Sequence, residues 1–194
     1  MNTAKPKQVY FFGTCLVDLF YPEAGLAGIR LIQREGVDVI FPQGQSCCGQ
    51  PAWNSGYRDE ARDVAAAQLA LFTKEIPVVV PSASCAGMMK EHYPALFRDT
   101  PLETIAVDLS KRIVELTAFL VDVLDIRIGD LGAPQKVAIH NSCSALREMQ
   151  VGDKIESLVS NLSRIEKVEQ AYKRECCGFG GTFSIKQPEI SGAM

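Results

Sequence analysis

The sequence predicts an α/β protein made of two pseudo-repeated halves, each built on a parallel sheet with cysteines at the carboxyl ends of its strands. Three observations predict this fold. Short apolar segments alternate with longer segments of helical periodicity, glycine or proline follows most of the apolar segments, and one cysteine pattern occurs twice along the 194 residues. Strands that alternate with helices pair in parallel through right-handed crossovers.

The first half contains three predicted strands and four predicted helices. Each strand is a short apolar run that ends at a turn, as at Pro42 after the second strand. Gly36 is a typical residue to end the first helix. The predicted strands cover residues 9–12, 37–41 and 78–80, and the predicted helices cover residues 22–35, 58–74, 86–97 and 111–125.

The same pattern restarts after a connection at residues 129–134. A strand is predicted at residues 137–139, a long helix from there to about residue 161, and a further strand at residues 164–171. We therefore expect a first copy of the unit at residues 1–130 and a second copy at residues 131–194.

The cysteines carry the clearest sign of this duplication. Cys15 and Cys143 are 128 positions apart, and the pairs Cys47-Cys48 and Cys176-Cys177 are 129 positions apart. Each pair is followed directly by glycine. A single Cys-Cys-Gly would be a weak motif, but two copies at matched spacing indicate a repeated site.

The first copy has a fourth cysteine, Cys85. Equal spacing would place its counterpart near position 214, beyond Met194, so we expect the second copy to be C-terminally incomplete. Cys15, Cys47, Cys48 and Cys85 follow three predicted strands, and the carboxyl ends of parallel strands share one edge of a sheet. The sequence therefore predicts that these four sulfur atoms converge.

Four clustered thiolates are the usual ligands of an iron–sulfur cluster, and structural zinc takes four as well. Gly49 and Gly178 allow the sharp backbone bend that lets adjacent cysteines face one group. We therefore expect a [4Fe–4S] cluster in one or both copies, with zinc possible in one of them. The predicted ligands are Cys15, Cys47, Cys48 and Cys85 in the first copy, and Cys143, Cys176 and Cys177 in the second.

Composition excludes several classes of function. The net charge of −3 is not the basic footprint of a nucleic-acid-binding protein. No run of about 18 apolar residues is present, so no membrane span is expected. The apolar segment after residue 8 is interrupted by Asp18 and lacks a cleavage site, so we expect a cytoplasmic protein. Seven cysteines in a reducing compartment favour metal binding over disulfides.

A few other residues have a structural explanation beside a functional one. His140 precedes Cys143 by three positions and is interpreted as structural rather than as a ligand. His92 is interpreted as a surface residue. Trp53 and Tyr57 follow the first cysteine pair and either shield a cluster or simply pack in the core.

The cysteine motifs resemble the cysteine-rich CCG domain family, whose members include a component of heterodisulfide reductase and the iron–sulfur subunit of glycolate oxidase. Residues 47–52 with 54–57, and residues 176–184, are most similar to the lactate-utilisation branch. The resemblance implies that the seven cysteines bind clusters. It also implies a role in oxidising L-lactate to pyruvate, in a complex with two sister subunits. Ser82 and Met88 stand where many members have a further cysteine, which favours an ordinary four-thiolate cluster over disulfide-reducing chemistry.

Three functions are therefore compared. The first is an iron–sulfur electron-transfer subunit of a lactate-oxidising complex, with glycolate as the alternative substrate. No flavin or nicotinamide fingerprint is present, so hydride chemistry would depend on partners. The second is a heterodisulfide-reductase-like thiol/disulfide catalyst. The third is a zinc-stapled scaffold that is not an enzyme. Whether the chain is itself catalytic is left open, and no catalytic residue is assigned.

Overall fold

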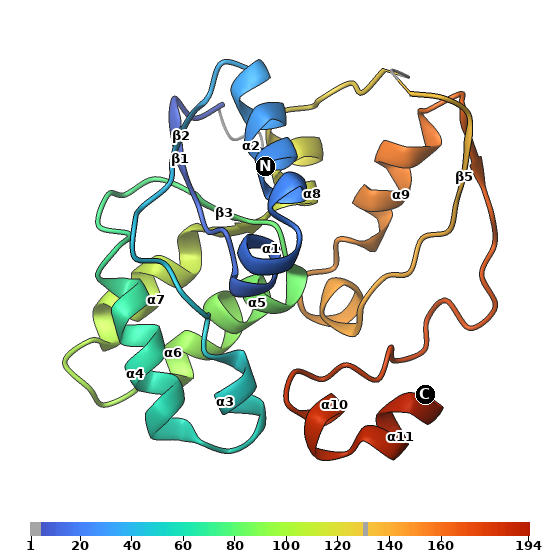
Figure 1. Cartoon of the computed structure of the whole chain (residues 1–194). Helices are drawn as coiled ribbons and strands as arrows, with labels where there is room; N and C mark the ends of the chain where they lie inside the picture. The colour runs from blue at the N-terminus through green and yellow to red at the C-terminus, as the bar shows by residue number, and fades with distance from the viewer. Residues whose placement is uncertain (1–4, 130–131) are drawn as a thin grey trace.

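The computed structural model describes residues 5–129 and 132–194. Helices surround a four-stranded parallel sheet, and a separate two-stranded parallel sheet lies at the right-hand edge of the molecule (Figure 1). The predicted α/β class with two parallel-sheet halves is therefore confirmed. The predicted boundary between residues 130 and 131 lies outside the described residues.

The four-stranded sheet contains strands β1 (Gln8–Phe11), β2 (Asp38–Ile40), β3 (Val78–Val80) and β4 (Ile113–Glu115) in the order β2-β1-β3-β4. All neighbouring strands are parallel. Helix α2 (Pro22–Arg34) connects β1 to β2, and α4 (Arg58–Leu69) lies in the connection from β2 to β3. This order makes β2, β1 and β3 neighbours, so the loops that follow them lie along one edge of the sheet.

The core lies on both faces of this sheet, because successive strand residues point to opposite sides. Val9 and Phe11 pack with Ile32 of α2 on one face. Tyr10 and Phe12 pack on the other, in a cluster that contains residues of α4 and of the segment after β3. Each of these side chains is at most 4% exposed. Full burial of such a side chain contributes about 1.5–3 kcal/mol, so β1 is anchored on both sides.

The segment after β3 is helical, as predicted, but begins earlier. It runs through α5 (Ala83–Gly87), the π-helix η1 (Met88–His92) and α6 (Tyr93–Leu96). Two short helices were not predicted. Helix α1 (Cys15–Phe20) comes after β1, and helix α3 (Gln50–Asn54) comes after the loop that follows β2.

The predicted helix at residues 111–125 is wrong in its first part. Helix α7 (Glu103–Arg112) ends there, and residues 113–115 form β4, which pairs with β3. The guanidinium group of Arg112 donates to the carbonyl oxygens of Phe72 and Lys74 at 2.9 and 2.7 Å. These bonds hold the end of α7 at the sheet edge, so β4 is extended. Helix α8 (Leu116–Ala118) and the π-helix η2 (Phe119–Val123) complete the segment.

The second sheet repeats the pairing of the first. Strand β5 (Gln135–Val137) is parallel to β6 (Ile165–Lys167), and Val137 pairs with Lys167. In the first sheet Val9 pairs with Val39, so the paired residues are 30 positions apart in both sheets. The strand before Cys143 thus pairs with the strand that follows it as the strand before Cys15 does, which supports a duplicated unit.

The second half also departs from the prediction. The expected long helix is divided into η3 (Ser144–Glu148) and α9 (Gly152–Ser160), and β6 covers only three of the eight residues expected. Gln150, between the two helices, has a φ of 53°, which no right-handed helix accommodates. The chain therefore turns there.

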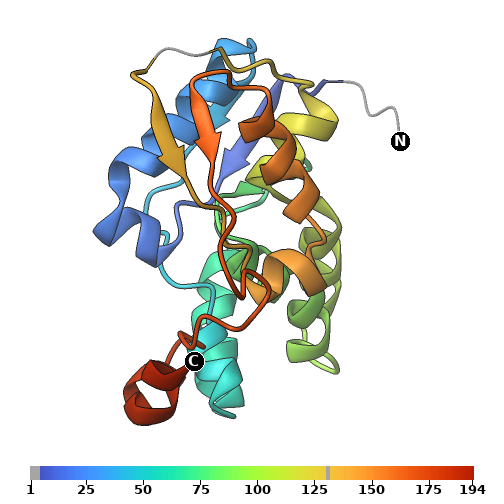
Figure 2. The ribbon, with the colours of Figure 1, turned by 90° about the vertical axis from the view of Figure 1, so that its right-hand side faces the viewer.

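The two halves lie against each other (Figure 2). Helix α5 contacts η3, and helices α10 (Phe183–Lys186) and α11 (Pro188–Ala193) lie near α3 (Figure 1). The hydroxyl groups of Ser55 and Thr182 are hydrogen-bonded across this contact. Among the helices in the described ranges, none has the length and apolar character needed to cross a membrane.

Candidate metal centre

The cysteines of the first copy are carried by the loops that follow three adjacent strands. Cys15 begins α1 after β1, Cys47 and Cys48 lie in the loop after β2, and Cys85 lies in α5 after β3. Since β2, β1 and β3 are neighbours, the sheet order itself places these loops together.

The four thiols contact one another in a chain. Cys15 interacts with Cys47, Cys47 with Cys48, and Cys48 with Cys85, and each of these thiol pairs is close enough for the partners to shift each other's pKa. Residues that span 70 positions of sequence therefore bring their sulfur atoms to one place. The structure agrees with the convergence that the strand order predicts, whereas the role of these thiols as ligands stays a prediction.

The contacts lower the pKa of two of the four thiols and raise the pKa of the other two. The hydrogen bond from Cys48 is the main cause that lowers the pKa of Cys47 to about 6, and it also lowers the pKa of Cys85. The pKa of Cys48 is raised, chiefly by its hydrogen bonds to the same two thiols. Burial, followed by the nearby charge of Cys47, raises the pKa of Cys15 to about 11. Cys47 and Cys85 thus favour the thiolate form that binds metals.

Gly49 shapes the loop around the cysteine pair. Its φ of 87° lies in the left-handed region, and a Cβ atom there would lie 3.0 Å from the carbonyl oxygen of Ala61. Its backbone N–H donates to the sulfur of Cys47 at 3.4 Å. Glycine is therefore required on conformational and steric grounds, and the bend that it allows directs an N–H at the sulfur.

Two glutamine side chains that the sequence did not single out, one partly and one fully buried, hold these loops in place. The amide of Gln45 accepts from the N–H of Gly13 at 3.0 Å and donates to the carbonyl of Phe11 at 3.1 Å, which joins the loops of Cys15 and Cys47. The fully buried Gln68 bonds both the N–H and the hydroxyl group of Ser46. Gln68 follows Ala61 by seven positions on the buried face of α4, and a polar residue at such a position is the sequence signal that could have identified it.

A second set of polar contacts surrounds Cys85. Hydrogen bonds from Ser82 and Ser84 contribute to the lowered pKa of its thiol, after the bond from Cys48 and against the effect of burial. The side-chain amide of Gln50 donates to the carbonyl of Ser84 at 3.1 Å. The helix that follows Cys48 is thereby tied to the helix that contains Cys85.

The donor set fits a group that is held by four thiolates. Four contacting thiols, two with a lowered pKa, and a backbone N–H directed at one sulfur are the features that such a group requires. As the side chains stand, no three or more His, Cys, Asp or Glu residues in ranges 5–129 and 132–194 are arranged to hold a metal ion.

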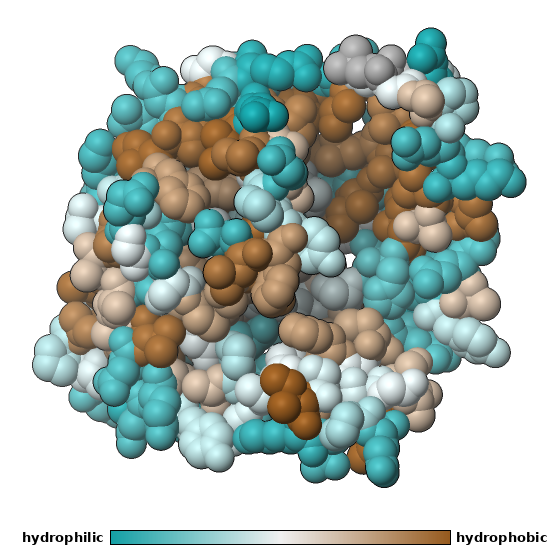
Figure 3. All heavy atoms as spheres, in the orientation of Figure 1, coloured by the Kyte–Doolittle hydropathy of each residue, from teal (hydrophilic) through white to brown (hydrophobic). Residues whose placement is uncertain are grey.

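A cavity of about 390 Å³ lies beside these thiols, with Cys15 and Cys47 in its wall. Helix α1 forms one side of it, and no residue of this helix is buried. Apolar residues gather on the surface over α1 (Figure 3). The exposed ones are Leu16, Leu19, Phe20 and Tyr21. The first-copy thiols therefore lie next to an apolar surface.

The cysteines of the second copy have a different environment. Cys143, Cys176 and Cys177 are all exposed, and in the part of the chain that the structure describes no hydrogen bond joins their thiols. The ring of His140 is hydrogen-bonded to the carbonyl of Glu175 at 3.1 Å, so the loops that carry Cys143 and Cys176 are joined. This contact supports the structural interpretation of His140.

The interpretation of His92 as an isolated surface residue is wrong. Its ring stacks on Trp53 at a centroid distance of 5.2 Å, and its Nε2 lies 3.5 Å from a carboxylate oxygen of Glu148 in the second half. The guanidinium group of Arg58 lies 3.3 Å from the centroid of Trp53. His92 thus belongs to the contact between halves, and Trp53 packs behind it against the core of the first half, which no local pattern reveals.

Comparison with known proteins agrees with the repeated cysteine loops. The model of the cysteine-rich CCG domain matches residues 9–90 and 137–194, and the two matched segments begin 128 positions apart. The chain belongs to the cysteine-rich CCG domain family. Each matched CCG segment contains the predicted cysteines of one copy.

Relatives of this CCG protein are similar over almost its whole length. It is 44% identical over 190 residues to lactate utilization protein A of Oceanobacillus iheyensis, which covers 96% of this chain and 77% of that protein. The same protein of Geobacillus kaustophilus is 44% identical, with 96% and 78% covered. Lactate utilization protein A 2 of Bacillus cereus is 38% identical over 188 residues, with 96% and 78% covered.

Proposed function

We propose that this protein is an iron–sulfur electron-transfer subunit of an oxidoreductase complex that oxidises L-lactate to pyruvate. The observation that carries the proposal is the contact of four thiols from three adjacent strand ends. Packing alone gives no reason for four cysteines so far apart in sequence to meet, whereas a shared ligand does.

Cys15, Cys47, Cys48 and Cys85 would hold one [4Fe–4S] cluster. Such a cluster, when bound, stores and releases single electrons at a potential set by its surroundings. The N–H of Gly49 would stabilise negative charge on the sulfur of Cys47, as it does in the structure. In the second copy, the proposed ligands are Cys143, Cys176 and Cys177.

The choice of lactate rests on the relatives, which are named for lactate utilization. No nucleotide-binding glycine fingerprint occurs in the sequence. The chain would therefore exchange electrons with sister subunits that carry out the hydride chemistry. The exposed apolar residues of α1 support such a partner, because they adjoin Cys15. Glycolate is the alternative substrate.

A thiol/disulfide catalyst is the second candidate. The cavity of about 390 Å³ reaches Cys15 and Cys47, so a small sulfur compound has access to two of the four thiols. In this function the chain, supplied with a chemical reductant as the source of two electrons, would reduce a disulfide substrate to two thiols without any partner protein, whereas an electron-transfer subunit would not.

Anaerobic purification, followed by iron and acid-labile sulfide analysis, tests the proposal. We expect a brown protein with iron and sulfide in equal amounts, and a paramagnetic signal after reduction by dithionite. A colourless protein that contains only stoichiometric zinc would contradict electron transfer and favour the zinc-stapled scaffold. Turnover of a disulfide by the isolated chain would favour the second candidate.

A further inference from the structure

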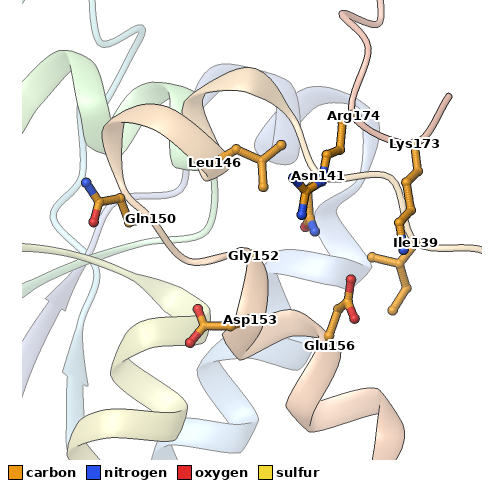
Figure 4. Close-up of a pocket in the computed structure, with 9 residues that line it drawn as sticks. All are labelled: Ile139, Asn141, Leu146, Gln150, Gly152, Asp153, Glu156, Lys173 and Arg174. Atoms are coloured by element: carbon orange, nitrogen blue, oxygen red, sulfur yellow. The ribbon is translucent and has the colours of Figure 1, made fainter.

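A second cavity, of about 570 Å³, opens between the loop that follows β5, the helices η3 and α9, and the loop that follows β6 (Figure 4). It lies beside the second cysteine loops, because Asn141 in its wall precedes Cys143 by two positions and Arg174 precedes Cys176 by two. Its volume is in the range of small-molecule sites. The polar and apolar side chains that line it indicate which kind of ligand it would take.

The wall of the cavity contains an arginine, Arg174, that is not paired with an acidic side chain in the described part of the chain. Its two acidic side chains already have partners, since Glu156 bonds Lys167 at 3.0 Å and Asp153 lies 3.6 Å from Lys154. Arg174 forms no ion pair or hydrogen bond with any residue in ranges 5–129 and 132–194. A guanidinium group presents two parallel N–H donors that match the two oxygens of a carboxylate. Arg174 acts on Glu156 only through its charge, so among the described residues of the wall its guanidinium group is the one that is available to pair with an anion.

Lys173 adds a second positive charge to the same wall. Its ammonium group bonds Glu169 at 3.0 Å, so it acts as a nearby charge and not as an unpaired donor. The hydrogen bond from Lys167 is the main cause of the lowered pKa of Glu156, and the charges of Lys173 and Arg174 contribute to it. Because both residues line the cavity, their charges act inside it.

The cavity also has an unused acceptor and an apolar wall. The side-chain oxygen of Asn141 is buried and has no hydrogen-bond partner among the residues that the structure describes. A buried acceptor without a donor is unfavourable, so a ligand hydroxyl group that donates to it would be stabilised. Ile139 and Leu146 line the same cavity and offer contact to carbon atoms.

We propose that this cavity binds a small 2-hydroxy carboxylate. Arg174 holds the carboxylate group, the side-chain oxygen of Asn141 accepts a hydrogen bond from the hydroxyl group, and Ile139 with Leu146 contacts the carbon chain. The preference for an anion stands on the cavity alone, whereas the choice of a 2-hydroxy acid and of L-lactate as the probe rests on the proposed function.

Saturation-transfer difference NMR with L-lactate on the folded chain tests this site. We expect transfer to the lactate methyl group, and binding that Arg174→Gln weakens by about tenfold or more, the effect of losing a charge-assisted bond. Arg98 is exposed and lies outside the cavity. The matched control Arg98→Gln should therefore leave binding unchanged. Absence of transfer in the unaltered chain, or equal binding by Arg174→Gln, overturns the proposal.

Propionate, which lacks the hydroxyl group, tests the role of Asn141. We expect propionate to bind more weakly than lactate, and Asn141→Leu to remove that difference. Equal binding of the two acids by the unaltered chain overturns the assignment of a 2-hydroxy acid. Circular dichroism shows that each variant is folded. Iron and sulfide in the same samples report on the proposed function separately, because lactate binding does not require that either be present.

Discussion

The hydroxyl group of Tyr93 donates a hydrogen bond to the backbone carbonyl of Cys48, 3.0 Å away, from a fully buried side chain. Burial, and then the nearby thiols of the first copy, raise the pKa of Tyr93, so it stays a neutral donor. Since Tyr93 follows the helix that contains Cys85, this bond fixes the position of one cysteine loop relative to another.

Tyr93→Phe removes this bond and leaves a buried carbonyl without a donor. We expect the free energy of unfolding to fall by about 1–2 kcal/mol, as measured by urea denaturation of the metal-free protein. Tyr57→Phe is the control, because the Tyr57 side chain is about half exposed and should change stability little. Equal stability of the two variants would mean that the Tyr93 bond does not support the loop.

Gly49→Ala separates backbone strain from steric overlap. Gly49 and Gly44 have almost the same φ, 87° and 84°, but only at Gly49 does an added Cβ meet another atom, the carbonyl oxygen of Ala61 at 3.0 Å. The strain of left-handed backbone costs about 1–2 kcal/mol at either site. We therefore expect Gly49→Ala to lower the free energy of unfolding by more than Gly44→Ala does. Equal losses would show that the overlap with Ala61 is relieved.

The thiol pKa values predict a pH-dependent order of alkylation in the metal-free protein. Only the thiolate reacts, so modification of Cys47 by iodoacetamide should rise with pH through about 6, and that of Cys15 only through about 11. Peptide mass spectrometry after brief labelling measures both rates. Cys47→Ser should remove the low-pH phase, and a phase that persists in this variant would belong to another thiol.

The same shift predicts how stability depends on pH. The pKa of Cys47 is lowered from 9.0 to about 6 in the folded chain, so the thiolate is favoured by folding. The contribution of the Cys47 thiolate to the free energy of unfolding is fully present above pH 9 and is lost as the pH falls through about 6. Urea denaturation of the metal-free protein should therefore show less pH dependence between pH 6 and 9 in Cys47→Ser than in the unaltered chain.

Much of the fold could be predicted from local patterns. Residues 9–12 and 78–80 are short apolar runs before turns, and strands are found there as expected, β1 over Gln8–Phe11 and β3 over Val78–Val80. Strand β4 was not predicted, because Ile113 and Leu116 have the spacing of one helix face. The pairing of Ile113 with Val78, which keeps this segment extended, is a tertiary contact that local sequence does not show. The long helix after Cys143 was expected because nothing in the sequence forbids it at Gln150, whose positive φ depends on packing.

The candidate site could be predicted in part. The cysteines follow strand ends, and strand order is simple enough to infer, so their convergence follows from sequence. Tyr93 and Gln45 could not be assigned, because each bonds a loop more than 20 positions away. The place of Gln68 on the buried face of its helix could have marked it as buried, but not its partner Ser46, which is 22 positions away. The contact of His92 with Glu148 joins the two halves, and the hydrophobic periodicity of the sequence does not predict such a contact.

Iron and acid-labile sulfide per chain in Cys48→Ala test most directly the claim that the first-copy thiols hold one cluster. Cys48 contacts both Cys47 and Cys85, and alanine leaves no ligand atom at the centre of the group. In anaerobically prepared protein we expect a loss of about four iron and four sulfide per chain relative to the unaltered protein. Ala52→Ser, in the helix that follows the same loop, should keep the full amount. Iron and sulfide contents of Cys48→Ala equal to those of the unaltered protein would contradict the account.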